Sequence, residues 1–192
     1  MKKYILSCLL VIYISFGFCQ DNETRLFSIS DHCGGFGGVS FNLFDGVHLG
    51  IMGEGAALIR NFYVGGYGYS SEMGNYTSSL TGKSYKLENS EGGLMFGAIS
   101  NTNALLALFS EVKIGFGKAV ARATLSDNVY EEYQKSIYSV SPKIGVSILP
   151  VQFIQIRLYA AYRFSSKMDF NNIIIPAQNA YVFGIGLFLG AF

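Results

Sequence analysis

The stretch IQIRLYAAYRFS, residues 154–165, alternates strictly between two kinds of side chain. Successive side chains of a β-strand point to opposite faces, so this period of two predicts a strand with unlike faces. Twelve residues at about 3.3 Å each, tilted by about 40°, would cross the hydrocarbon core of a bilayer. The apolar face is Ile154, Ile156, Leu158, Ala160, Tyr162 and Phe164, and the other face is Gln155, Arg157, Tyr159, Ala161, Arg163 and Ser165.

The same alternation recurs along the rest of the chain. In residues 138–148, Ser139, Lys143 and Ser147 lie on the face opposite to Tyr138 and Ile144. Less regular alternation predicts six more strands, and no helical period of any length follows the leader at residues 1–19. These six strands are expected at residues 33–44, 47–60, 62–71, 92–100, 106–118 and 180–192.

The connections between these strands alternate in length. Tight turns are expected at residues 60–61, 101–103 and 149–151, and longer polar segments at 72–91, 122–135 and 166–178. Asp45-Gly46 is an exception, a tight hairpin turn where a long connection is expected. Alternating short and long connections are typical of an up-and-down barrel whose two rims face different compartments.

The polar face of the strands is mostly Ser, Gly and Ala, whose sizes suit the narrow lumen of an eight-stranded barrel. Only 14% of the residues are charged, whereas a soluble domain carries about 25%. These features predict an all-β fold, an eight-stranded antiparallel up-and-down transmembrane β-barrel with its apolar face toward lipid. Aromatic residues near strand ends are expected to form interfacial girdles, namely Phe44, Tyr138, Phe153, Tyr162, Phe164 and Tyr181.

The first residues read as a secretory leader. Lys2-Lys3 precede an apolar run over residues 4–18, and Gly17 and Cys19 stand at the −3 and −1 positions of a cleavage site before Gln20. Lipidation at Cys19 is the alternative reading. The expected organisation is a cleaved signal peptide at 1–19, a short segment at 20–31 and the barrel at 32–192.

Without the leader, the chain carries 12 basic and 13 acidic residues. This balance gives no reason to expect a nucleic-acid partner. Cys33 is then the single cysteine, so neither an intrachain disulfide nor a zinc cluster is expected. We expect its thiol to be packed within a glycine-rich strand.

These features resemble the small eight-stranded outer-membrane barrels of Gram-negative bacteria, similar to the membrane domain of outer membrane protein A and to outer membrane protein X. The resemblance covers residues 32–192 and rests on the leader, the alternating connections and the terminal Phe192 of an aromatic strand. It implies a location in the bacterial outer membrane, a surround of outer-membrane lipid, and recognition by the barrel assembly machinery during biogenesis. It also implies a lipid-facing terminal aromatic, whereas Phe192 shares the face of Gly184, Gly186 and Gly190, so a bulge would be needed.

Catalytic and cofactor motifs are not expected in this chain. Thr81-Gly82-Lys83-Ser84 resembles the end of a phosphate loop, but Thr77 stands where that loop needs glycine. The only histidines, His32 and His48, do not form the Ser-His-acid pattern of a hydrolase or a metal site. We therefore predict no enzyme, no catalytic residue, no cofactor and no metal.

The charges on the predicted lumen face carry the functional hypothesis. Counting residues along each strand places these charges near the middle of the barrel. Burying an unpaired charge there would cost several kcal/mol of folding free energy. We expect one structural hydrogen-bonded cluster that closes the lumen, with surface loops or envelope structure as the role of the protein and an unnamed loop partner. A narrow channel for small solutes or ions is the alternative. The predicted cluster is Glu54, Glu111, Lys113, Lys143 and Arg157.

Overall fold

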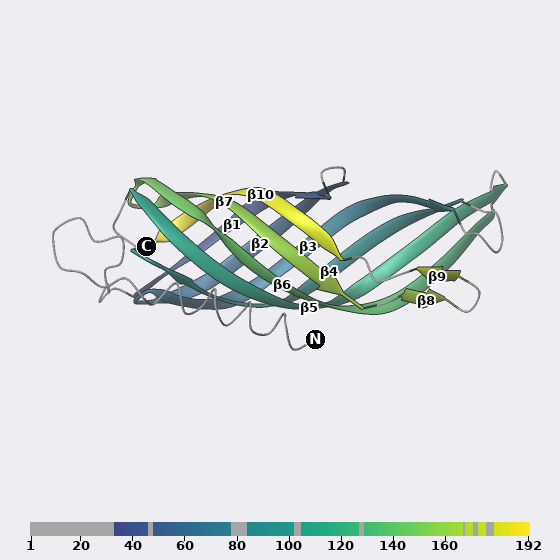
Figure 1. The fold of residues 1–192 in the computed structure, drawn as a ribbon, viewed down its shortest axis with the longest axis horizontal. Coiled ribbons are helices and arrows are strands. Elements are labelled where there is room, and N and C mark those ends of the chain that lie inside the picture. The colour runs from purple at the N-terminus through teal and green to yellow at the C-terminus, as the bar shows by residue number, and fades with distance from the viewer. Residues whose placement is uncertain are drawn as a thin grey trace.

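The computed structural model describes residues 33–45, 48–77, 84–101, 105–126, 129–166, 168–170, 173–175 and 179–192. Eight antiparallel strands close into one barrel in the order β1-β10-β7-β6-β5-β4-β3-β2, with β1 paired to β2 (Figure 1). The predicted all-β, eight-stranded antiparallel up-and-down barrel is confirmed. Its strands are β1 (Cys33–Phe44), β2 (His48–Ile59), β3 (Phe62–Thr77), β4 (Ser84–Ile99), β5 (Leu106–Ser126), β6 (Val129–Val151), β7 (Ile154–Ser165) and β10 (Ala180–Ala191).

Four strands run well beyond the predicted length. Residues 72–91 and 122–135 were expected to be loops, and this prediction was wrong: β3 and β4 stay paired as far as Thr77 and Ser84, and β5 and β6 as far as Ser126 and Val129. The outer face loses its apolar residues here, so the apolar outer pattern of a membrane strand ends although the backbone ladder continues. We call residues 72–77, 84–90, 118–126 and 129–137 the hairpin extension, which protrudes at the end opposite the C-terminus (Figure 1).

Part of the third polar segment, expected at 166–178, is also strand. β8 (Met168–Phe170) and β9 (Ile173–Ile175) pair with each other in a separate two-stranded sheet. No helix in the described part of the chain is long and apolar enough to cross a membrane.

The barrel is apolar outside and polar inside. Among the outward-facing residues, Ile144, Leu158 and Ile185 are 53%, 46% and 49% exposed. In the lumen, Ser147 and Gln155 are completely buried. A soluble barrel would have the reverse arrangement, so the apolar belt fits a lipid environment.

Aromatic residues lie on the outer face near the ends of the belt. Tyr138, Phe153 and Tyr181 are each more than half exposed, as expected of an interfacial girdle. Phe44 was also assigned to the girdle, and this assignment was wrong. It occupies a lumen-facing position of β1 and packs against Tyr69, with ring centroids 5.4 Å apart.

Large rings fit in the lumen because glycines lie beside them. A Cβ atom placed on Gly97 would come within 2.2 Å of the Tyr63 ring, and one on Gly184 within 2.4 Å of the Tyr159 ring. No side chain could share that space. The glycines of the strands therefore make room for tyrosines from neighbouring strands.

The last strand keeps one register throughout. β10 pairs with both β1 and β7 without a bulge, so the bulge that the resemblance required is not formed. Phe192 consequently faces the lumen, and its ring stacks on Phe36 at 5.8 Å. The strand itself lies where the sequence predicted it.

Of the predictions for the N-terminal part of the chain, the structure describes only the one for Cys33. The leader at 1–19, the segment at 20–31, Cys19 and His32 lie outside the described residues. Cys33, predicted to be packed, is exposed as the first residue of β1, because odd-numbered positions of this strand face outward.

A closed barrel has no free edge from which to unravel. We expect the folded protein to migrate faster on a denaturing gel when unboiled than when boiled. Unboiled and boiled samples that migrate alike would contradict a closed, detergent-resistant barrel. Gly65→Pro, within the β2-β3 ladder, should weaken the barrel and abolish the fast form at a lower temperature.

Candidate functional site in the barrel lumen

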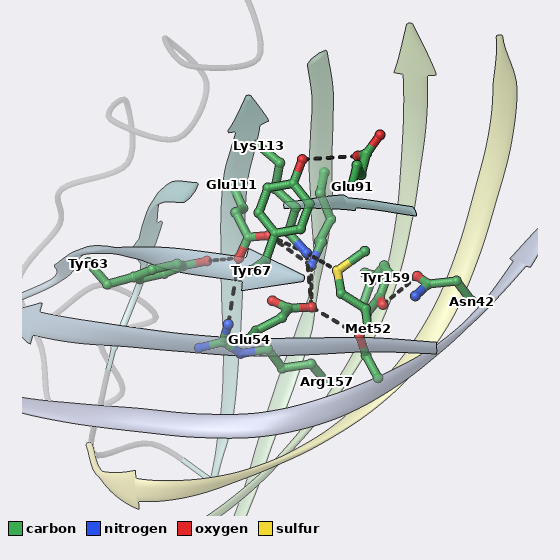
Figure 2. A network of polar contacts seen from close by, with 12 residues as sticks. Asn42, Met52, Glu54, Tyr63, Tyr67, Glu91, Glu111, Lys113, Arg157 and Tyr159 are labelled. Carbon is green, nitrogen blue, oxygen red and sulfur yellow. Dashed lines mark hydrogen bonds and ion pairs between the residues drawn. The ribbon is translucent and has the colours of Figure 1, made fainter. Parts of the chain in front are cut away.

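The structure brings the five predicted lumen charges together in one group, which we call the central cluster (Figure 2). They come from four strands, and all are at least 95% buried. Glu111 on β5 lies directly opposite Lys143 on β6, which fixes one ion pair by strand register alone. The members of the central cluster are Glu54, Glu111, Lys113, Lys143 and Arg157.

Glu111 is the hub of the central cluster. Its carboxylate lies 2.8 Å from the Lys143 ammonium, 3.4 Å from Lys113 and 3.7 Å from Arg157. Glu54 lies 2.9 Å from Lys113 and 3.4 Å from Lys143, and it accepts a hydrogen bond from Ser40. Each carboxylate is thus shared between cations, as a buried charge requires.

Arg157 has a second set of partners that the sequence analysis did not identify. Its guanidinium lies over four aromatic rings, which we call the aromatic cage, and its Nε donates to Gln155 Oε1 at 2.7 Å. Cation–π contacts of this kind stabilise a desolvated guanidinium. The rings are those of Phe36 at 4.2 Å, Phe188 at 4.6 Å, Phe109 at 5.0 Å and Tyr63 at 5.1 Å.

The aromatic cage is joined to the central cluster. The Tyr63 hydroxyl donates a hydrogen bond to Glu111 at 2.9 Å, as Figure 2 shows. Phe36 and Tyr63 lie edge to face with centroids 5.3 Å apart, and Phe36 and Phe188 do so at 5.6 Å. Rings and charges therefore form one connected, buried group in the lumen.

A second buried ion pair lies nearer the hairpin extension. Arg163 Nη2 is 2.6 Å from Glu91, which also accepts hydrogen bonds from Tyr67 and Ser139. The Arg163 guanidinium lies 5.6 Å from the Tyr69 ring centroid. Sequence analysis missed this pair because Glu91 was placed in a loop.

One signal could have revealed Glu91. Leu87, Asn89 and Glu91 occupy alternate positions in line with the lumen-facing Met95, and all four are buried. The alternation in β4 therefore begins before the first residue that was assigned to the strand.

A cavity of about 30 Å³ lies between the central cluster and the Glu91–Arg163 pair. Its lining includes residues of both groups, namely Lys113, Lys143, Glu91 and Arg163, together with Asn42. A single water molecule needs at least about 10–15 Å³. The cavity therefore has room for at least one small species.

The outer face of the hairpin extension carries a ladder of exposed charges. Lys86 pairs with Glu72 at 2.9 Å, and Arg122 pairs with Glu88 at 2.8 Å and with Glu132 at 2.9 Å. Hydrogen bonds from Gln134 and Arg122 hold the pKa of Glu132 below its usual range. The hydrogen bond to Glu72 raises the pKa of Lys86. Such a surface suits water rather than lipid.

The described residues include no group of three or more His, Cys, Asp or Glu side chains that could hold a metal. His48, at the first position of β2, has no hydrogen bond to a serine or carboxylate within the described chain.

Comparisons with known proteins identify the fold. No protein-family model matches the chain, and no curated protein matches it in sequence. Neisserial surface protein A has a similar structure, with a TM-score of 0.54 at 9% identity, covering 82% of this chain and 94% of that one. This similarity shows that the chain has the fold of the small eight-stranded outer-membrane barrels, as predicted.

Two other solved barrels align at lower scores. The N-terminal β-barrel domain of OprF from Pseudomonas aeruginosa gives a TM-score of 0.47 at 7% identity, covering 85% of this chain and 99% of that one. Ail, the attachment invasion locus protein of Yersinia pestis, gives 0.44 at 14% identity, covering 82% and 97%. The likeness to Neisserial surface protein A is one of fold.

Proposed function

We propose that this protein is a non-enzymatic outer-membrane barrel with a sealed lumen, which acts through the hairpin extension and its connecting loops or as envelope structure. The aromatic cage around Arg157 is the observation that carries the proposal. Four rings from four strands converge on one guanidinium and leave it 1% exposed. A charge that lined a wet passage would keep its hydration instead.

The central cluster supports the same conclusion. Its carboxylates and ammonium groups form ion pairs with one another, and all of its members are buried. Ion conduction needs a continuous path with room for a partly hydrated ion. Buried, mutually paired charges in the lumen therefore support closure of the barrel.

The proposed partners follow from the two surfaces of the molecule. The apolar belt fits outer-membrane lipid, and the charge ladder of the hairpin extension fits the aqueous side of that membrane. Recognition by the barrel assembly machinery during biogenesis is part of the proposal and comes from the family resemblance.

Single-channel recording in planar bilayers tests the sealed lumen. We expect the purified barrel to give no reproducible conductance steps, because the aromatic cage and the central cluster occupy the cross-section. Insertion is verified by the fast gel form of protein recovered from the same bilayers.

The narrow-channel alternative predicts a different record. Reproducible steps in the parent, with an ion selectivity that changes in Lys113→Gln, would overturn the sealed lumen, since a charge that lines a wet pore selects ions. Phe183→Ala, on the lipid-facing side of β10, is the control that should leave the record unchanged. Phe36→Ala together with Phe188→Ala should open the aromatic cage and produce leak.

A further inference from the structure

The cavity between the two charge groups has an unusual set of polar atoms. Among the residues that line it, the buried side-chain atoms without a hydrogen-bond partner are Asn42 Nδ2 and Arg163 Nε and Nη1. All three are donors. Asn42 and Arg163 are 1% and 3% exposed, so bulk water does not satisfy these groups.

Two acceptors around the same cavity already accept hydrogen bonds. Asn42 Oδ1 accepts a hydrogen bond from the Tyr159 hydroxyl at 2.7 Å, as Figure 2 shows. Glu91 Oε1 accepts from Tyr67 and Ser139, and Glu91 Oε2 accepts from Arg163. A water molecule has two lone pairs for the three unpartnered donors, whereas a monatomic anion can accept from all three.

The buried side chains of the lumen carry an excess of positive charge, which also favours an anion. The buried charged side chains of the described residues comprise four bases and three acids, so one positive charge is unbalanced. Two of the bases, Lys113 and Lys143, also line the cavity. The bases are Lys113, Lys143, Arg157 and Arg163, and the acids are Glu54, Glu91 and Glu111.

We propose that this cavity binds one small monovalent anion of the halide type, with chloride as the physiological candidate. The amide nitrogen of Asn42 and the guanidinium of Arg163 donate hydrogen bonds to it, and the ammonium groups of Lys113 and Lys143 supply its counter-charge. A neutral water would leave the positive charge unbalanced, whereas a monovalent anion would balance it. The ion is a structural ligand that is captured as the barrel closes, a role beyond the sealed lumen itself.

Linkage between halide and folding tests the site. The protein is unfolded and refolded in detergent micelles at constant ionic strength while chloride, or bromide, replaces methanesulfonate. One bound ion should raise the ratio of folded to unfolded protein by up to about tenfold for each tenfold rise in halide above the dissociation constant. A parent protein whose folding ratio does not respond to halide would overturn the proposal.

Two matched variants separate the site from a general salt effect. Asn42→Leu removes a donor from the cavity, whereas Asn89→Leu makes the same change at an equally buried asparagine that does not line it. We expect the halide dependence to vanish in Asn42→Leu and to persist in Asn89→Leu. If both variants keep the dependence of the parent, halide acts elsewhere and the site is wrong.

Anomalous diffraction gives a readout that does not depend on any variant. Crystals of protein refolded in bromide should show one bromine peak between Asn42 and Arg163 in the parent. The peak should be absent from Asn42→Leu if that variant folds. Density in the cavity without an anomalous signal would identify a water and overturn the proposal even if the halide titration were positive.

Discussion

Glu111→Gln should lower the free energy of unfolding by about 3–5 kcal/mol, because it removes one partner from a buried charge network. Glu111 is shared by Lys143, Lys113 and Arg157, and it accepts the Tyr63 hydroxyl. The substitution leaves three buried cations in the central cluster and only one carboxylate, that of Glu54. The chain contains no Trp, so reversible urea unfolding in lipid is followed by far-ultraviolet circular dichroism and gel mobility.

A double variant within the central cluster is the control for this result, because it measures whether the two side chains interact. Glu111→Gln combined with Lys143→Met removes one charge of each sign, and we expect the double variant to recover much of the lost stability. If the two changes instead destabilise additively, the charges do not form one network and water fills the lumen around them. Arg157→Met should cost less than Glu111→Gln, since Glu111 then keeps both lysines.

Ile185→Arg should destabilise the barrel by about 2–4 kcal/mol, as expected of a cation near the bilayer midplane. Ile185 lies in the middle of β10, faces outward and pairs with Phe41 and Leu158 on the adjacent strands. The long arginine side chain would have to reach the interface or carry water into the hydrocarbon. Reversible unfolding in lipid vesicles measures the cost.

The depth dependence of this cost tests the lipid-facing assignment. Leu49→Arg makes a similar change on the outer face near the end of β2, where 71% of the leucine is exposed. Close to an interface, such a substitution costs only about 0–1 kcal/mol. Equal costs for Ile185→Arg and Leu49→Arg would show that the belt does not lie in a bilayer as assigned.

The strand faces were accessible from the sequence because the period of two is a local property. Arg157, Lys143 and Glu111 could be assigned to the lumen from their immediate neighbours alone. Their approximate height followed from counting along hairpins with short turns, which leave little freedom in register. The residues of the central cluster could therefore be named before their contacts were known.

The hairpin extension was not predicted, because its outer face is polar. Beyond the lipid belt the strands carry polar residues outside and buried residues such as Tyr85, Leu87 and Ile137 inside. The pattern of an apolar outer face is therefore lost there, although alternation and pairing continue. Glu91 was placed in a loop for this reason, and the partner of Arg163 was missed with it.

The sequence by itself determined that the chain forms a barrel of alternating strands and which side chains enter its lumen, because these follow from neighbours along each strand. Closure of the barrel decided which lumen residues meet. The aromatic cage around Arg157, the inward turn of Phe192 and the donor-lined cavity beside Asn42 each join strands distant in sequence. Such contacts depend on the stagger of all eight strands around the closed sheet, which no single stretch of sequence encodes.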